Sequence, residues 1–160
     1  MNGPTSPEAA VTQSVSVVID RPPAVVWAAV TDITRTGEWS PECIAGRWID
    51  GATGPAAGAR FEGDNAVTVA GRAIKRWTTT SEVTACTAEQ CFEFVSAGYT
   101  TWRYDLVAEG EGTKVTESYR HAPHKGWQKF LYDTVARRDR TMRTGMQRTL
   151  ERMKAVLEAS

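Results

Sequence analysis

Histidine and cysteine are scarce in this sequence, which has two histidines and three cysteines among 160 residues. The cysteines (Cys43, Cys86 and Cys91) form no CxxC pair, and their odd number favours reduced thiols and a cytoplasmic protein. Their spacing from the two histidines is too irregular for a metal-ligand cluster. We therefore expect neither a metal nor a cofactor.

The sequence also lacks a long hydrophobic run and an excess of charge of either sign. No stretch approaches the roughly 18 apolar residues of a membrane-spanning helix, so we expect no stable membrane insertion. The 19 basic residues balance the 19 acidic ones, which argues against a nucleic-acid partner. The GxSxG, HExxH, P-loop and GxGxxG motifs are absent, so the sequence offers no ready-made catalytic constellation.

The N-terminus shows no basic segment followed by an apolar one, so it does not read as a signal peptide. Residues 1–10 are polar and are predicted to be a disordered tail. Residues 11–160 have the length of a single domain, and an apolar content of 41% is enough to bury a core.

Alternation of apolar and polar residues predicts seven strands separated by short turns. We place them at Val11–Ile19, Ile44–Asp50, Arg60–Asn65, Arg72–Thr84, Gln90–Val95, Thr100–Val107 and Thr113–His121. Two short helices follow the first strand: one begins at Pro23, which suits a first helical turn, and the other covers Thr34–Glu38. Six consecutive strands with short connections indicate an antiparallel meander.

The last stretch, Lys125–Glu158, is predicted to be one long helix, about 50 Å at ~1.5 Å per residue. Its apolar residues recur at helical spacing: Trp127, Leu131, Val135, Met142, Met146, Leu150, Met153 and Leu157. Such a stripe needs a large apolar surface. We therefore predict an α+β fold in which a curved seven-stranded sheet wraps the helix and leaves a cavity between them.

Several segments, in this order, resemble the START-like or SRPBCC superfamily and its polyketide cyclase/dehydrase and lipid transport branch, especially small actinobacterial members. The matching segments are Pro23–Trp27, Trp39–Glu42, Gly58–Asn65, Thr113–Tyr119 and Gly145–Glu151, together with Trp77 in the long strand. The resemblance covers Val11 to Leu157 and implies the helix-grip fold. It does not identify a function, because this fold carries lipid carriers, receptors, cyclases and oxygenase subunits.

The resemblance and the strand alternation together predict which residues line the cavity. They are Trp39, Phe61, Asn65, Trp77, Phe94, Trp102, Tyr104, Glu117, Tyr119, Met142, Gly145, Met146 and Thr149. The simpler alternative is that the aromatic residues and the methionines only fill the core. Polar residues recur on the same strand faces, however, and burying them without partners costs about 1–3 kcal/mol each, which favours a pocket.

Glu117, Tyr119 and Arg138 are the candidate catalytic residues. A desolvated Glu117 would have a raised pKa and could act as a general acid or base. It could instead form a structural ion pair with Lys75, Arg72 or an arginine of the helix. Gly145, in the middle of the helix, could leave room for a ligand or could let the helix approach the sheet closely.

Three functions are compatible with this sequence. The first is binding of a hydrophobic small molecule, lipid or polyketide-like, without chemistry. The second is a cofactor-free polyketide aromatase/cyclase or dehydratase that acts on a ligand in the cavity. The third is a regulatory module that binds a protein partner, for which the arginines near residue 138 are the only support. A monomer and a homodimer are both compatible with the sequence.

Overall fold

The computed structural model describes residues 11–121 and 132–160, with side chains for residues 13–121 and 140–160. The predicted disordered tail, residues 1–10, lies outside the described residues. In chain order the elements are β1 (Val11–Ile19), α1 (Pro23–Thr31), the 3-10 helix η1 (Ile33–Glu38), β2 (Cys43–Ile49), β3 (Arg60–Val69), β4 (Arg72–Thr87), β5 (Cys91–Ser96), β6 (Thr100–Glu109), β7 (Gly112–His121) and α2 (Tyr132–Glu158).

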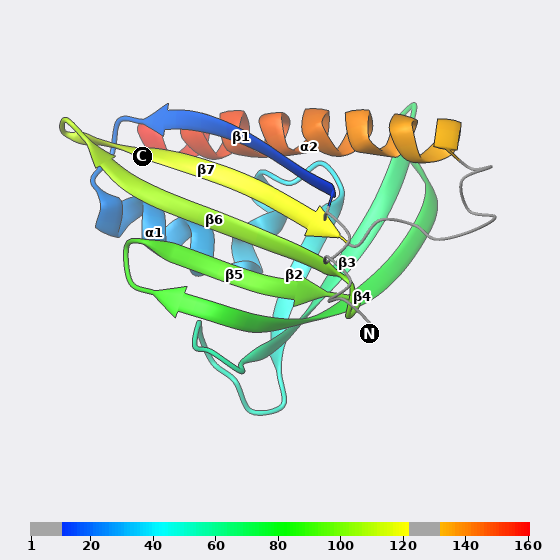
Figure 1. Cartoon of the computed structure of the whole chain (residues 1–160), viewed down its shortest axis with the longest axis horizontal. Coiled ribbons are helices and arrows are strands. Elements are labelled where there is room, and N and C mark those ends of the chain that lie inside the picture. The colour runs from blue at the N-terminus through cyan, green and yellow to red at the C-terminus, as the bar shows by residue number, and fades with distance from the viewer. Residues whose placement is uncertain (1–10, 122–131) are drawn as a thin grey trace, which may run out of the picture.

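The seven strands form one antiparallel sheet in the order β1-β7-β6-β5-β4-β3-β2. Strands β2 to β7 follow one another as a meander, and β1 joins the far edge by pairing with β7. The sheet is strongly curved, and α1 and α2 lie on the same side of it (Figure 1). The predicted α+β helix-grip architecture is confirmed.

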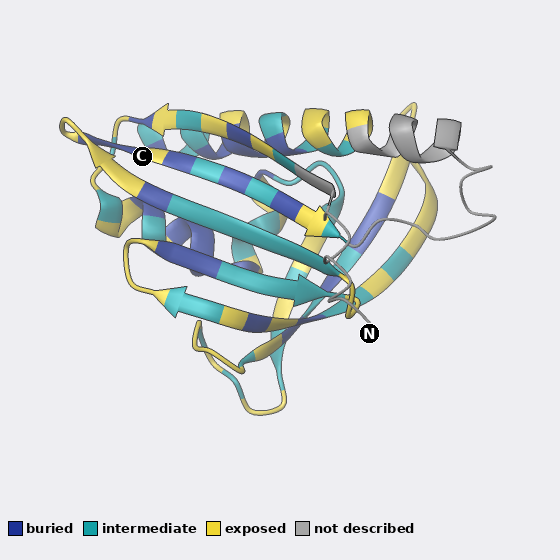
Figure 2. Ribbon diagram, in the orientation of Figure 1, coloured by how far each residue is buried: buried dark blue, intermediate teal, exposed yellow. Residues whose placement is uncertain are grey.

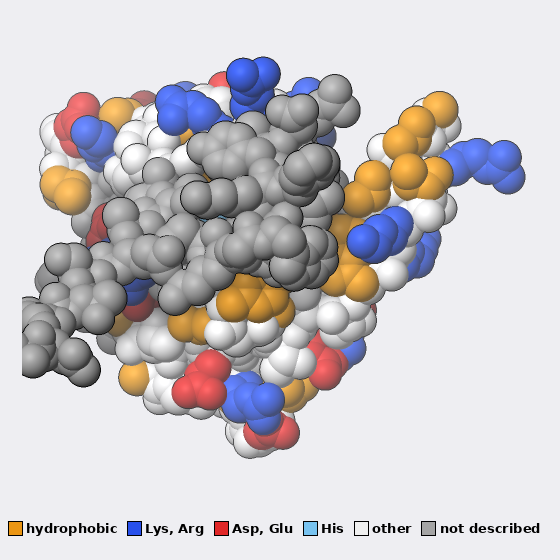
Figure 3. Space-filling model, turned by 45° about the vertical axis from the view of Figure 1, so that its right-hand side comes forward, with side chains coloured by type: hydrophobic (Ala, Val, Ile, Leu, Met, Phe, Trp, Pro, Cys, Tyr) orange, Lys and Arg blue, Asp and Glu red, His pale blue; other side chains and the backbone are white. Residues whose placement is uncertain are grey.

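The β3–β4 hairpin is longer than predicted, because β3 ends at Val69 and not at Asn65. The turn between the strands has φ values of 49° at Ala70 and 77° at Gly71, the positive values of a two-residue hairpin turn. The outer part of the hairpin projects from the body, with hydrophobic side chains beside cationic ones (Figure 3). Val67, Val69 and Ile74 are exposed there.

Helix α2 holds the sheet together through the C-terminal half of its apolar stripe. Leu150, Met153 and Leu157 are buried, with exposed fractions of 0%, 1% and 4%, and they share one core with Ile19 of β1 and Val115 of β7. Figure 2 shows the described part of α2 exposed on its outer side and buried where it runs alongside β1 and β7. The predicted start of the helix, residues 125–131, lies outside the described residues.

Polar contacts fix the C-terminal end of α2 against the end of β1. The carboxylate of Glu158 accepts hydrogen bonds from the Asp20 backbone N–H and from Lys154 Nζ, both at 2.7 Å. The Arg21 guanidinium donates to the carbonyl oxygens of Glu158 and Ser160 at 3.1 and 2.6 Å. These bonds satisfy acceptors that the end of a helix leaves open and set the position of α2 along the sheet.

Helix η1 and strand β2 approach each other so closely that glycine is required on both. A Cβ atom at Gly37 would lie 2.3 Å from the carbonyl oxygen of Ile44, and one at Gly46 would lie 2.3 Å from that of Ile33. Backbone atoms cannot yield as flexible side chains do, so larger residues here would separate the two elements. This contact brings the corner after η1 to face the middle of α2.

We predict that Leu150→Ala lowers the free energy of unfolding by about 2–5 kcal/mol, because it leaves a cavity in the core beneath α2. Urea denaturation measures this loss. Arg148→Ala on the exposed face of the same helix is the control and should change stability by less than about 0.5 kcal/mol. Equal effects of the two substitutions would contradict the packing described here.

Candidate functional site

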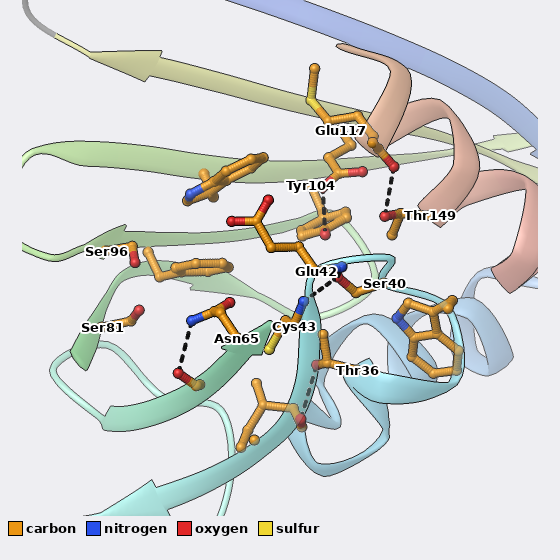
Figure 4. Close-up of a pocket in the computed structure, with 18 of the residues that line it drawn as sticks. Thr36, Ser40, Glu42, Cys43, Asn65, Ser81, Ser96, Tyr104, Glu117 and Thr149 are labelled. Atoms are coloured by element: carbon orange, nitrogen blue, oxygen red, sulfur yellow. Dashed lines mark hydrogen bonds between the residues drawn. The ribbon is translucent and has the colours of Figure 1, made fainter. Parts of the chain in front are cut away.

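A cavity of about 170 Å³ lies between the sheet and α2. Drug-sized ligands occupy pockets of roughly 300–1,000 Å³, whereas an engineered cavity of about 150 Å³ holds benzene. This volume therefore matches a small molecule of one or two fused rings or a short chain. The lining comes from α1, η1 and the corner after it, from β2 to β7, and from α2 (Figure 4).

Aromatic rings and methionine side chains form the apolar wall. Phe61 and Phe94 meet edge to face with ring centroids 5.0 Å apart, and Phe92 packs on Phe94 at 5.7 Å. Met142 and Met146 line the cavity from α2. Such aromatic clusters are rigid, whereas methionine adapts to the shape of its neighbours, so the wall combines a fixed side with an adaptable one.

Glu117 is the one acidic residue deeply buried in this wall. It lies on β7 with 4% of its surface exposed, and Tyr104 lies directly opposite it on β6. The Tyr104 hydroxyl donates a hydrogen bond of 2.8 Å to Glu117 Oε1. Glu117 Oε2 is buried and has no hydrogen-bond partner. The sequence left open a bond to Lys75, Arg72 or a helix arginine, and the described contact is instead with tyrosine.

Burial favours the neutral form of both residues. It raises the pKa of Glu117 to about 8, although the hydrogen bond from Tyr104 acts in the opposite direction. Burial and the neighbouring Glu117 carboxyl raise the pKa of Tyr104 well above its ordinary value. Near neutral pH, Glu117 therefore carries a proton in the folded protein and can donate it.

Other polar groups of the lining find partners within the protein. The amide of Asn65 donates to the carbonyl oxygen of Gly63 at 3.0 Å and to the Thr79 hydroxyl at 3.2 Å. The Thr149 hydroxyl donates to the carbonyl oxygen of Gly145 at 2.9 Å. Their burial is thus explained without a ligand. Among the described side chains, Gln13 is the only other one with a buried unpaired atom, and it does not line the cavity.

The corner between η1 and β2 forms the rim opposite α2. Ser40 Oγ accepts hydrogen bonds from the backbone N–H groups of Glu42 at 3.2 Å and Cys43 at 2.9 Å, which shapes this turn. The Glu42 side chain reaches from the corner into the cavity (Figure 4). Burial raises the pKa of the Cys43 thiol, so that group is unreactive at neutral pH. The sequence marked this corner only as the segment Trp39–Glu42 of the family resemblance, and it gave Ser40, Glu42 and Cys43 no role in the lining.

The structure brings most of the predicted lining residues together. Trp39, Phe61, Asn65, Phe94, Trp102, Tyr104, Glu117, Met142, Gly145, Met146 and Thr149 all border the cavity. Trp77 and Tyr119 do not. Trp77 lies farther out on the β3–β4 hairpin beneath Lys75, whose Nζ is 5.2 Å from the ring centroid. Tyr119 is buried between the rings of Trp102 and His121, at 5.4 and 5.9 Å.

Of the residues of α2 that the sequence singled out, the structure describes Gly145 but not the side chain of Arg138. A Cβ atom at Gly145 would meet only Pro41 Cγ, at 3.9 Å, which is an ordinary contact. Close packing therefore does not require glycine at this position, and the space in front of it belongs to the cavity. The side chain of Arg138, a candidate catalytic residue, lies outside the described side chains, as does most of the arginine cluster behind the partner-binding hypothesis.

The described part of the chain has neither a metal-ligand cluster nor a membrane-spanning helix. The side chains described, those of residues 13–121 and 140–160, contain no group of three or more His, Cys, Asp or Glu that could hold a metal ion. None of the helices described there is long and apolar enough to cross a membrane.

We predict that the raised pKa of Glu117 makes the protein less stable as pH rises. The unfolded chain releases this proton near the ordinary carboxyl pKa, whereas the folded protein holds it up to a pH of about 8. Between about pH 5.5 and 7.5 the folded state therefore binds one more proton, and the free energy of unfolding falls by about 1.4 kcal/mol per pH unit.

Urea denaturation across this pH range measures the free energy of unfolding of the wild type and of Glu117→Gln. The substitution should remove the pH dependence that Glu117 causes. Glu111→Gln, which removes an exposed carboxyl group in the β6–β7 turn, is the control. Parallel stability curves for the wild type and Glu117→Gln would show that Glu117 is not held neutral.

Comparisons with solved structures agree with this fold. A polyketide-cyclase-like protein from Corynebacterium glutamicum is 34% identical over 94% of this chain and 86% of its own, with a TM-score of 0.50. The KanY protein is 19% identical over 94% of this chain and 99% of its own, with a TM-score of 0.70. The di-domain aromatase/cyclase StfQ of the steffimycin biosynthetic pathway is 12% identical over 95% of this chain and 52% of its own, with a TM-score of 0.73.

No functionally curated protein matches the sequence. A family model, in contrast, matches residues 10–158, nearly the whole chain. Its description is polyketide cyclase/dehydrase and lipid transport. Together with the 34% identity to the Corynebacterium protein, this match assigns the family and confirms the resemblance found in the sequence. The chain belongs to the polyketide cyclase/dehydrase and lipid transport family.

Proposed function

We propose that this protein binds a small hydrophobic molecule in the cavity between the sheet and α2. The observation that carries the proposal is a mostly apolar, partly open cavity in which one buried polar atom, Glu117 Oε2, has no hydrogen-bond partner. Ligand pockets combine a mostly apolar wall with a few placed polar groups in this way. The family description, which includes lipid transport, is consistent with such a ligand.

The size of the cavity limits the ligand. A volume of about 170 Å³ encloses one or two fused rings or a short chain, so any longer molecule would extend past the rim at Glu42 and Ser40. Met142 and Met146 are the lining side chains best able to move for a larger ligand, since methionine has several rotatable bonds and no branch. The proposal therefore favours compact apolar ligands.

We predict that indane, an apolar bicyclic hydrocarbon, binds saturably to the wild type and that Gly145→Leu abolishes this binding. The leucine side chain would occupy the cavity, because only Pro41 lies near the position of its Cβ atom. It should not unfold the helix, since replacing a helical glycine gains up to about 1 kcal/mol. Chemical shift changes in protein NMR spectra measure the binding.

Thr144→Leu is the matched control, because it adds the same side chain at the neighbouring, exposed position of α2. This variant should bind indane as the wild type does. Indane shifts that persist in Gly145→Leu, or that are absent from the wild type, would contradict a ligand site in this cavity. Native mass spectrometry of protein purified from its host then identifies the natural ligand by its mass.

A second candidate function is acid–base chemistry on the bound ligand, as in a cyclase or dehydratase. The observation that favours it is the Tyr104–Glu117 pair, whose carboxyl group has a pKa of about 8 and so can exchange a proton near neutral pH. One structural neighbour, StfQ, is an aromatase/cyclase. Here Glu117 would protonate a carbonyl or hydroxyl oxygen, and solvent water would take the proton lost from the neighbouring carbon, while the cavity holds the chain in a reactive conformation.

We predict that, if this chemistry occurs, the protein accelerates the exchange of the α-protons of 1-indanone with deuterium from solvent. Glu117→Gln keeps the shape of the side chain but cannot transfer a proton, so it should remove the acceleration. Proton NMR of the ketone measures the exchange rate. An acceleration that survives the substitution would remove Glu117 from the mechanism, and no acceleration in the wild type would leave binding as the function.

A further inference from the structure

We propose that Glu117 recognises its ligand as a neutral carboxyl group, donating a hydrogen bond from Oε2 to a carbonyl oxygen of an otherwise apolar molecule. This inference rests on the proposed binding function and names the chemical class of the ligand. The ligand would carry one hydrogen-bond acceptor, and that acceptor would lie where β6, β7 and α2 meet.

The geometry of the Tyr104–Glu117 pair determines which oxygen faces the ligand. Tyr104 stands opposite Glu117 in the β6–β7 register, and its hydroxyl proton is directed to Oε1 at 2.8 Å. Oε1 is thus engaged as an acceptor. The proton of a neutral carboxyl group then belongs on Oε2, the atom that is buried and has no partner within the protein. A buried donor of this kind requires an acceptor.

The surroundings favour the neutral form over an ionised one. Val15 of β1 lies opposite Glu117 across the strands, and α2 presents Met142, Met146 and Thr149 to the cavity. None of these side chains carries a positive charge that could stabilise an ionised Glu117. Burying an unpaired carboxylate costs far more than burying a neutral acid, so the group keeps its proton.

Other titratable groups of the lining must be considered because the proposal predicts a pH dependence. They are Tyr104 on β6, Glu42 at the rim and Cys43 at the start of β2. Burial raises the pKa of both Tyr104 and Cys43 above the ordinary phenol and thiol values, so both lose their protons at a higher pH than Glu117 does. Glu42 is half-buried at the rim and is the group that must be tested separately.

The chemistry of the pair also limits the ligand. A carbonyl, ester or ether oxygen accepts from the neutral carboxyl group without bringing a charge into the apolar wall. A carboxylate ligand would bring a negative charge into the apolar wall, and it would meet no described cation in the lining. The site therefore selects ketone-like or ester-like molecules over fatty acids.

The test compares 1-indanone with indane, two molecules of nearly the same shape of which only the first carries a carbonyl group. Dissociation constants are measured by NMR titration of the whole protein at about pH 6.5 and pH 9.5. In the wild type at the lower pH, 1-indanone should bind roughly tenfold more tightly than indane, the effect of one buried hydrogen bond. At the higher pH Glu117 is ionised, repels the carbonyl oxygen, and the preference should disappear.

Two substitutions of Glu117 separate the contribution of its hydrogen bond from that of the ligand's fit in the cavity. Glu117→Leu removes the donor, so the preference for 1-indanone should be lost at both pH values. Glu117→Gln replaces the carboxyl group by an amide that does not titrate, so whatever preference remains should be independent of pH. Should the leucine variant fail to fold, the pH profile of the glutamine variant still decides between the alternatives.

Three outcomes would overturn the proposal. Equal binding of indane and 1-indanone to the wild type at the lower pH would show that Oε2 donates nothing. If the preference for 1-indanone still depends on pH in Glu117→Gln but not in Glu42→Gln, the titrating group is Glu42 and not Glu117. Failure of both molecules to bind would overturn the proposed function itself, and this inference with it.

Discussion

The burial of Leu150, Met153 and Leu157 against β1 and β7 is the constraint on which the rest of the structure depends. It holds the C-terminal half of α2 on the sheet, while bonds from Asp20 and Arg21 fix the end of the helix. The same stripe continues upstream as Met142 and Met146, where the sheet has curved away and the helix covers a cavity. One helical face therefore both fills a core and closes a site.

Within that site, the pairing of Glu117 with Tyr104 is the feature that packing alone does not account for. A core built only for stability would place an apolar residue at position 117, since an unpaired buried polar atom costs about 1–3 kcal/mol. Asn65 and Thr149 satisfy their hydrogen bonds within the protein, and Glu117 Oε2 does not. Residues that destabilise a fold in this way are common at functional sites.

Much of this arrangement was predictable from the sequence. Strand alternation placed Phe61, Asn65, Phe94, Trp102 and Tyr104 on the cavity face, and the helical spacing of the methionines placed α2 above them. The periodicity works because each strand is buried on one face only. The architecture followed from the same pattern.

The contact between Tyr104 and Glu117 was also within reach of the sequence. The turn at Gly110 and Glu111 joins β6 directly to β7, and counting outward from it pairs residue 104 with residue 117. We predicted a short turn here without its register, and therefore left an ion pair with Lys75, Arg72 or a helix arginine open as an alternative. The pKa of Glu117, in contrast, depends on burial by helices distant in the sequence, which no local pattern predicts.

The reach of the hairpin and the shape of the rim could not be predicted in the same way. Alternation placed Trp77 among the lining residues, but it could not show that β3 and β4 continue beyond the cavity. The corner containing Ser40 and Glu42 has no periodicity, and its position depends on the contact of η1 with β2 at Gly37. Irregular segments placed by tertiary contacts carry little signal of their own.

The central claim is that the cavity holds a carboxyl group that stays neutral in the folded protein. Carbon-13 NMR of the glutamate carboxyl groups in the free protein tests it most directly, with the Glu117 signal assigned by its loss in Glu117→Gln. The account predicts a titration midpoint for Glu117 at a pKa of about 8. A midpoint near the ordinary glutamate value of about 4.3 would contradict it.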